Sequence, residues 1–141
     1  MPPVTWSESY RTGHDGLDSH HRDLLSVLSR VRDAVDQELA RARVLGLLDE
    51  WLDLFARHAR IEEKLLERLC LPGAIAHREA HIAEHAEFLH QAMAVRNDYA
   101  RGGDGHEALD RLGAQLIAFD MIRRDFEMIG LLLREGIALE P

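Results

Sequence analysis

The chain has 141 residues, which is enough for one domain and too few for two comfortable ones. Hydrophobic residues make up 46% and charged residues 30%, as in a soluble globular protein, and the formal charge of -8 disfavours binding to nucleic acid or to an anionic membrane. Cys70 is the one cysteine and no apolar run approaches the ~20 residues of a membrane helix, so we expect a cytoplasmic protein without internal disulfide, secretion signal or membrane span.

Apolar residues recur at three- and four-residue steps along most of the chain, which predicts helices, and glycines and prolines interrupt the pattern. We expect an irregular N-terminal arm over residues 1–17, with Asp18 as the N-cap of the first helix. The helices are predicted over about 18–38, 42–69, 74–100 and 106–135. Short connections make successive helices antiparallel, so residues 18–141 are predicted to form one all-α, up-down-up-down four-helix bundle.

The chain has nine histidines, and several of them stand at helical spacing from one another or from an acid in the two middle predicted helices. His58 and Glu62 in the second predicted helix are four residues apart, as are His81 and His85 in the third. This spacing places both members of each pair on one face of the helix, one above the other.

The two outer helices add further candidates. In the first, the apolar stripe places His21 on the inward side and leaves His20 exposed. In the fourth, Asp120 and Asp125 lie within a mostly apolar inward face. Each helix therefore carries one or two potential ligands toward the middle of the predicted bundle.

These groups together indicate a metal site. Burying so many ionisable side chains without compensation costs several kcal/mol each, and metal ions supply the compensation. Mixed imidazole and carboxylate ligands suit iron, and also manganese or zinc. A carboxylate can bridge two cations and an imidazole cannot, so four histidines with two or three carboxylates predict a dinuclear site rather than a mononuclear one.

The remaining histidines have simpler interpretations. His14, His90 and His106 are expected to be solvated or structural. His77 lies one turn before His81 on the same face, where it could support a ligand or serve as an alternate one.

Two other metal-binding architectures fit the sequence poorly. A ferritin-like diiron bundle needs two Glu-x-x-His motifs, and only one copy, Glu87 to His90, is found. A zinc-protease helix needs His-Glu-x-x-His, which is absent.

Three motifs in combination resemble the hemerythrin-like proteins, specifically the bacterial single-domain type. They are Trp6…Tyr10-x-Thr12-Gly13…Leu17-Asp18-x-x-His21, His58-x-x-x-Glu62-Glu63 and His81-x-x-x-His85-x-x-Phe88. The resemblance covers most of residues 6–126. It implies a four-helix bundle that holds two iron ions (Fe2+/Fe3+), with an oxo or hydroxo bridge derived from O2.

The resemblance also implies a role for each ligand. His21 and His58 would bind one iron, His81 and His85 the other, and Glu62 and Asp125 would bridge the two.

One position departs from the family pattern. The family has a further histidine five residues before the bridging aspartate, where this chain has Asp120. Either Asp120 or His77 would complete the site, and with Asp120 it would hold four histidines and three carboxylates. An added carboxylate stabilises the ferric state and lowers the reduction potential, which favours O2 activation over reversible O2 release.

Small side chains also replace bulkier family residues beside the predicted site, at Leu54, Ala59 and Leu116. We expect a pocket large enough for a small organic substrate, and its candidate lining residues are Leu28, Leu54, Ala59, Leu116 and Met121. The alternative is that the same space is filled by Trp51, Phe55 and Phe119.

Three classes of function follow from these observations. The first is an O2 carrier, store or sensor. The second is a diiron oxidoreductase, namely an oxidase, oxygenase or peroxidase, with a small organic substrate and a reductase as partners. The third is a redox-silent metal-binding protein, for example with zinc. Asp120 and the expected pocket favour a protein that binds O2 and activates it, with no nucleic acid or membrane as partner.

Overall fold

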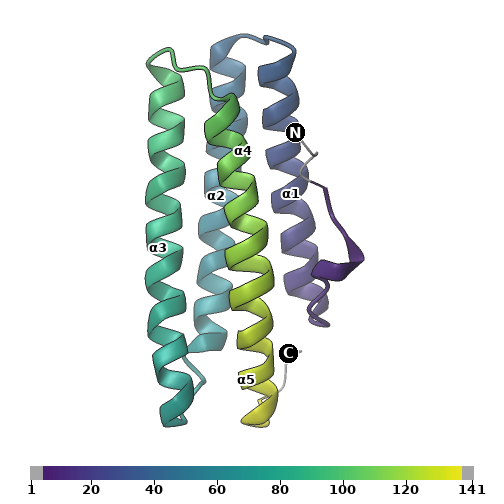
Figure 1. Cartoon of the computed structure of the whole chain (residues 1–141), viewed down its shortest axis with the longest axis vertical. Helices are drawn as coiled ribbons and strands as arrows, with labels where there is room; N and C mark the ends of the chain where they lie inside the picture. The colour runs from purple at the N-terminus through teal and green to yellow at the C-terminus, as the bar shows by residue number, and fades with distance from the viewer. Residues whose placement is uncertain (1–4, 138–141) are drawn as a thin grey trace.

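The computed structural model describes residues 5–137 and confirms an all-α bundle of four antiparallel rods (Figure 1). Three rods are single helices and the fourth is built from three consecutive helical segments. In chain order they are α1 (Asp15–Asp36), α2 (Arg41–Leu66), α3 (Pro72–Ala100), and then α4 (His106–Gln115), η2 (Leu116–Asp125) and α5 (Phe126–Arg134). The first four residues of the predicted arm and the last four of the predicted domain lie outside the described residues.

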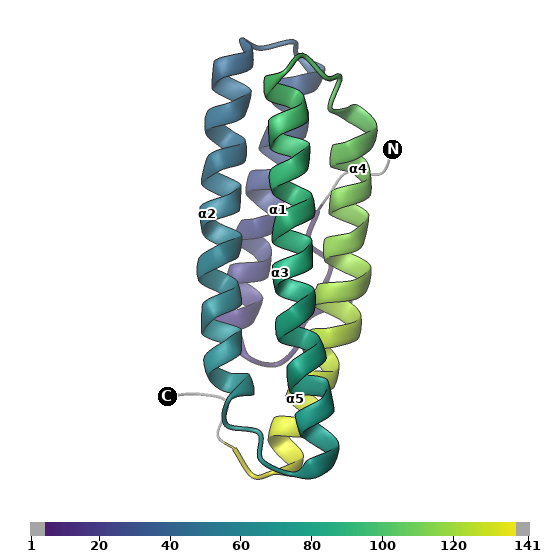
Figure 2. The same ribbon diagram turned by 90° about the vertical axis from the view of Figure 1, so that its left-hand side faces the viewer.

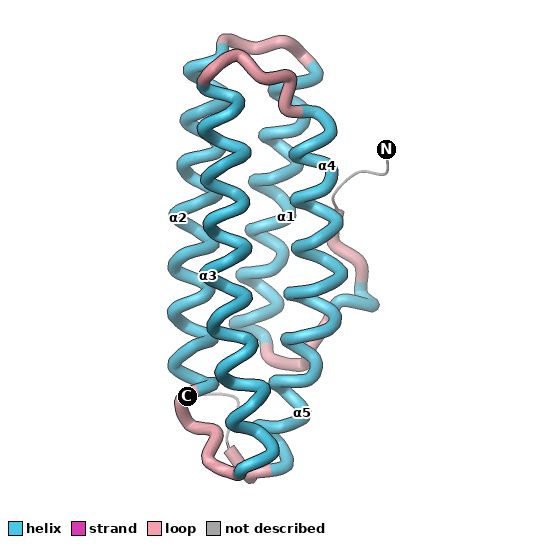
Figure 3. Tube along the Cα trace, turned by 60° about the vertical axis from the view of Figure 1, so that its left-hand side comes forward, coloured by secondary structure: helices cyan, strands magenta, loops and turns pink. Residues whose placement is uncertain are grey.

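The connections lie at the two ends of the bundle, as Figures 2 and 3 show. The arm contains a short 3-10 helix, η1 (Glu8–Tyr10), and runs along the outside of the bundle. Within residues 5–137, no helix is long and apolar enough to cross a membrane.

The start of α1 differs from the prediction, and Asp18 is not its N-cap. The helix begins at Asp15, and the cap is His14, whose Nδ1 accepts a hydrogen bond from the backbone N–H of Leu17 at 3.1 Å. Asp18 is buried inside the first turns, and its carboxylate accepts hydrogen bonds from the N–H and hydroxyl of Thr12 at 2.9 and 2.8 Å. Asp18 therefore ties the arm to the bundle instead of starting the helix.

Two apolar clusters form the core and leave a polar layer between them. The larger is centred on Trp51 and Phe55, and the indole N–H of Trp51 donates to the carbonyl of Leu24 at 3.0 Å. The smaller lies at the other end of the bundle and includes Leu17, Leu66, Leu69, Ala74, Met128, Ile129 and Leu132. On every rod the candidate ligands lie in sequence between members of these two clusters, so apolar packing encloses them from both sides.

Removing the Asp18 carboxylate should destabilise the fold, because it leaves partly buried donors of the arm without their acceptor. We expect Asp18→Ala to lower the free energy of unfolding by about 1–3 kcal/mol, measured from the urea midpoint. The matched control is Asp33→Ala, at an exposed position of the same helix, which should change it by less than about 0.5 kcal/mol. Equal midpoints for the two variants would show that Asp18 does not anchor the arm.

Candidate metal centre

The structure brings all seven predicted ligand residues together in the polar layer. None is more than 9% exposed, and Asp120 is the most exposed of them. They come from all four rods: His21 from α1, His58 and Glu62 from α2, His81 and His85 from α3, and Asp120 and Asp125 from η2.

The π-helical segment η2 explains how Asp120 and Asp125 reach the same site. In an α-helix, residues five apart point about 140° away from each other, because each residue turns the chain by about 100°. In a π-helix the hydrogen bonds close on the fifth residue, so residues five apart lie on the same face. The wider turn of η2 therefore places both carboxylates in the interior, where both are buried.

The ligand atoms fall into two overlapping groups, and within each group they lie no more than 4.8 Å from one another. One group contains His21, His58, Glu62, Asp120 and Asp125, and the other contains Glu62, His81, His85 and Asp120. The four histidines divide into the same two pairs that the hemerythrin resemblance implies. Glu62 and Asp120 belong to both groups, whereas Asp125, which the resemblance implies as a second bridge, belongs to the first group alone.

Asp125 also lies between the two histidine pairs. Its Oδ2 lies 2.7 Å from Nε2 of His21, and its Oδ1 lies 3.1 Å from Nε2 of His81. On the opposite side, Oε1 of Glu62 lies 2.6 Å from Nε2 of His58 and 3.4 Å from Nε2 of His85.

The orientation of these atoms fits metal ions better than it fits hydrogen bonds. The Nε2 atoms of all four histidines are buried, as are both oxygens of Glu62 and of Asp125, and none has an aligned hydrogen-bond partner among the described residues. Unsatisfied buried polar atoms are costly and rare. Here they converge from four directions on a common interior, so cations at the centre would satisfy all of them at once.

Crowding of charge shifts the pKa of the histidines. Burial opposes protonation of His21, but the adjacent Asp125 carboxylate outweighs it and raises the pKa of His21 to about 9. Burial likewise opposes protonation of His81, and Asp120 and Asp125 raise its pKa to about 9. Burial also opposes protonation of His85, but Asp120 and Glu62 raise its pKa to about 11.

The pKa values of the two aspartates at the centre shift in opposite directions. Burial and the Glu62 charge oppose ionisation of Asp120, but contacts with His81 and His85 lower its pKa to about 2. For Asp125, burial and the charge of Asp120 raise the pKa to about 7. His21, His81, His85 and Asp120 thus hold one another in their charged forms, whereas Asp125 keeps a proton more readily, and cations bound at the centre would replace these protons.

Side chains around the centre orient two of the imidazole ligands. Nδ1 of His85 donates to Oε2 of Glu63 at 3.2 Å, because a carboxylate only accepts. His77 is buried behind His81, with its Nε2 3.1 Å from Nδ1 of His81 and its Nδ1 3.1 Å from Oε1 of Glu127. His77 lies in neither ligand group, and its place supports His81.

The sequence did not reveal Glu63 and Glu127 in these roles. Glu63 was visible only as the residue after Glu62 in the second-helix motif. Glu127 is seven residues from Asp120 along the fourth rod, and its contact with His77 of α3 depends on how the rods pack.

The five residues predicted to line a pocket do not line one together: no cavity characterised in residues 5–137 contains more than one of them. Leu28, Leu116 and Met121 are buried in the larger apolar cluster with Trp51 and Phe55, and Leu54 packs partly buried against it. Ala59 lines a cavity of about 240 Å³ between α2 and α3, together with Phe55, Glu63 and His85. Phe119 is 54% exposed, so it does not fill the core as the repacking alternative supposed.

The histidines outside the centre have varied surroundings. His90 is exposed, His20 is half-buried, and His106 contacts the carboxylates of Asp36 and Asp104. His14 is the helix cap described above.

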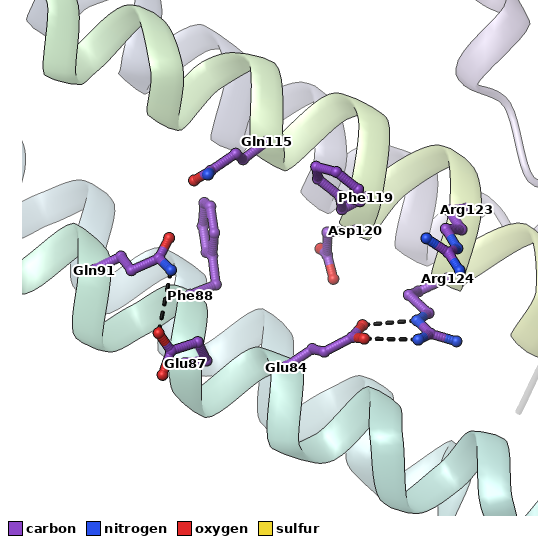
Figure 4. A pocket seen from close by; sticks show the side chains of 9 residues that line it. All are labelled: Glu84, Glu87, Phe88, Gln91, Gln115, Phe119, Asp120, Arg123 and Arg124. Atoms are coloured by element: carbon purple, nitrogen blue, oxygen red, sulfur yellow. Dashed lines mark hydrogen bonds and ion pairs between the residues drawn. The ribbon is translucent and has the colours of Figure 1, made fainter.

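A cavity of about 210 Å³ reaches the centre between α3 and η2 (Figure 4). Asp120 lies at its inner side, and its other lining residues are Glu84, Glu87, Phe88, Gln91, Gln115, Phe119, Arg123 and Arg124. This opening was not predicted from the sequence, in which Phe119 was a candidate to fill the core, whereas in the structure its ring borders the cavity.

The pKa shifts predict how the metal-free protein responds to pH. His21 and His81 have folded-state pKa values raised from 6.5 to about 9, so the folded state binds more protons than the unfolded state between these values. The stability that these two histidines contribute is therefore fully present below pH 6.5 and is lost as the pH rises through about 9. After chelation, we expect the free energy of unfolding to fall by roughly 2–5 kcal/mol between pH 6.5 and 9.5 in urea titrations.

His90→Gln, at an exposed position of α3, should retain this pH dependence, whereas His21→Gln should reduce it. A metal-free protein that is more stable at pH 9.5 than at pH 6.5 would contradict the charge arrangement.

Comparison with known protein families agrees with this geometry. The family model of the hemerythrin HHE cation-binding domain matches residues 12–128, a range that includes both ligand groups. Comparisons with curated proteins and with solved structures gave no significant match. The match covers well over half of the chain, so the chain belongs to the hemerythrin HHE cation-binding domain family.

Proposed function

We propose that this protein holds two iron ions and uses them to bind O2 and activate it. The observation that carries the proposal is that Glu62 and Asp120 belong to both ligand groups of one buried site. Shared carboxylates can hold two cations side by side, and the remaining imidazole and carboxylate groups form the mixed donor set that suits iron.

Two iron ions held here would supply the electrons that reduce O2. The protein keeps the histidine Nε2 atoms available by fixing the proton on the other ring nitrogen. His85 holds its proton on Nδ1 by donating it to Glu63. His81 can do the same toward His77, whose own Nδ1 lies 3.1 Å from the Glu127 carboxylate.

The carboxylate content favours activation over reversible binding. Asp120, Glu62 and Asp125 bring three negative charges to the centre, and such charges stabilise the more oxidised metal. With an imidazole at position 120, the centre would be one charge less negative and would release O2 more readily. This is the reason to prefer an oxidase, oxygenase or peroxidase over an O2 carrier or sensor as the function of this chain.

Metal analysis tests the dinuclear assignment. We expect the purified, iron-loaded protein to hold two iron ions per chain and Glu62→Ala to hold one or none, because it loses an oxygen donor common to both groups. Glu67→Ala, at an exposed position just after α2, should retain both, and circular dichroism should show that all three proteins are folded. Two metals bound per chain in Glu62→Ala would remove Glu62 from its bridging role.

Restoring an imidazole tests the role of Asp120. In stopped-flow mixing of the reduced protein with O2, we expect rapid oxidation of the wild type and slower oxidation of Asp120→His by about tenfold or more, for ~1.4 kcal/mol or more of redox stabilisation. The control is Asp98→His, an exposed position on α3.

Three results would revise the proposal. An unchanged spectrum, metal content and oxidation rate in Asp120→His would show that Asp120 is not a ligand. A wild-type adduct that releases its O2 under vacuum would assign a carrier or sensor instead. No optical change on mixing would assign a redox-silent metal site.

A further inference from the structure

The cavity between α3 and η2 is the one opening, among those characterised in residues 5–137, whose lining includes Asp120. Asp120 is 9% exposed, whereas Glu62 and Asp125 are completely buried. A molecule that enters this cavity therefore approaches the centre from the side of Asp120, and Figure 4 shows the carboxylate facing the space between the two helices.

One end of the cavity is closed by a fixed ion pair. Arg124 of η2 donates from Nε and one terminal nitrogen to the two oxygens of Glu84 of α3, both at 2.6 Å (Figure 4). A bidentate arginine–carboxylate pair is rigid and satisfies both groups. These two charges therefore form a wall and do not recruit a charged ligand.

Two phenylalanines supply the apolar surface. Phe88 of α3 is held from behind by aromatic neighbours, with its ring centre 4.9 Å from that of Phe55 and 5.9 Å from that of Trp51. Phe119 of η2 is 54% exposed and borders the same cavity. A supported ring on one helix and an exposed ring on the other favour a flat apolar ligand.

The charges around the cavity favour a ligand without net charge. Outside the Arg124–Glu84 pair, a cation would meet Arg123, and an anion would meet Glu87 and Asp120. Asp120 lies on the inner side of the cavity, where its carboxylate is the hydrogen-bond acceptor nearest the centre. The best match is a neutral molecule with one hydrogen-bond donor directed at Asp120.

The volume limits the size of that molecule. An engineered apolar cavity of about 150 Å³ in another protein takes up benzene. A cavity of about 210 Å³ therefore has room for a single substituted ring.

We propose that this cavity binds a small neutral phenol, with its ring between Phe88 and Phe119 and its hydroxyl group directed at Asp120. The binding site rests on the geometry of the cavity alone. Only the statement that the phenol is the substrate of the centre rests on the proposed function.

The test is calorimetric titration of phenol into the reduced, iron-loaded protein without O2, so that no turnover occurs. Phenol should bind with a stoichiometry of one per chain. Phe119→Ala should weaken binding by about fivefold, as expected for the loss of one aromatic contact of ~1 kcal/mol. Phe126→Ala removes a half-exposed ring of the same rod that does not line the cavity and should leave the affinity unchanged.

Benzoate and benzylammonium have the same ring with opposite charges and should bind more weakly than phenol. Tighter binding of either ion, the absence of saturable phenol binding, or equal loss of affinity in Phe119→Ala and Phe126→Ala would overturn the proposal.

Iron content and O2 reactivity, measured on the same samples, separate the two proposals. Two irons and O2 reactivity without phenol binding would refute the cavity as a phenol site and leave the diiron function intact. Phenol binding that depends on Phe119 in a protein without two irons would support the cavity site and refute the diiron function.

Discussion

Mutual compensation of charge at the middle of the bundle is the constraint on which the structure depends. Four imidazoles and three carboxylates lie together between two apolar clusters, and each of these groups alone would be costly to bury. Protons shared among them or cations placed between them remove that cost. The positions of the helices follow, because every rod must keep its ligands at the same level of the bundle.

The fourth rod meets this requirement through a change of helix type. A regular α-helix would direct Asp120 and Asp125 to different sides, and the π-helical turn brings both inward. Phe119 of the same segment is exposed, and the cavity beside Asp120 lies between this segment and α3. One segment of the fourth rod therefore supplies both carboxylates and one side of the cavity.

Much of the fold and of the candidate centre could be predicted from the sequence. The apolar period predicted the four rods, and i,i+4 spacing placed His58 with Glu62 and His81 with His85, because both signals depend only on regular helix geometry. Asp18 was misassigned as a cap, because its true partner, Thr12, lies in an irregular segment where spacing carries no geometric information.

The features that the sequence left out depend on packing between helices. The contact of His77 with Glu127, the ion pair of Arg124 with Glu84 and the cavity beside Asp120 each join α3 to the fourth rod. These contacts depend on how two helices are placed relative to each other. The pattern of residues within one helix does not specify that placement.

The most direct test of the central claim is an anomalous-difference map collected at the iron absorption edge from crystals of the iron-loaded protein. The account predicts two peaks about 3.5–4 Å apart in the polar layer, one beside His21 and His58 and the other beside His81 and His85, with Glu62 in contact with both. A single peak, or histidines 21, 58, 81 and 85 turned away from the metal, would contradict it.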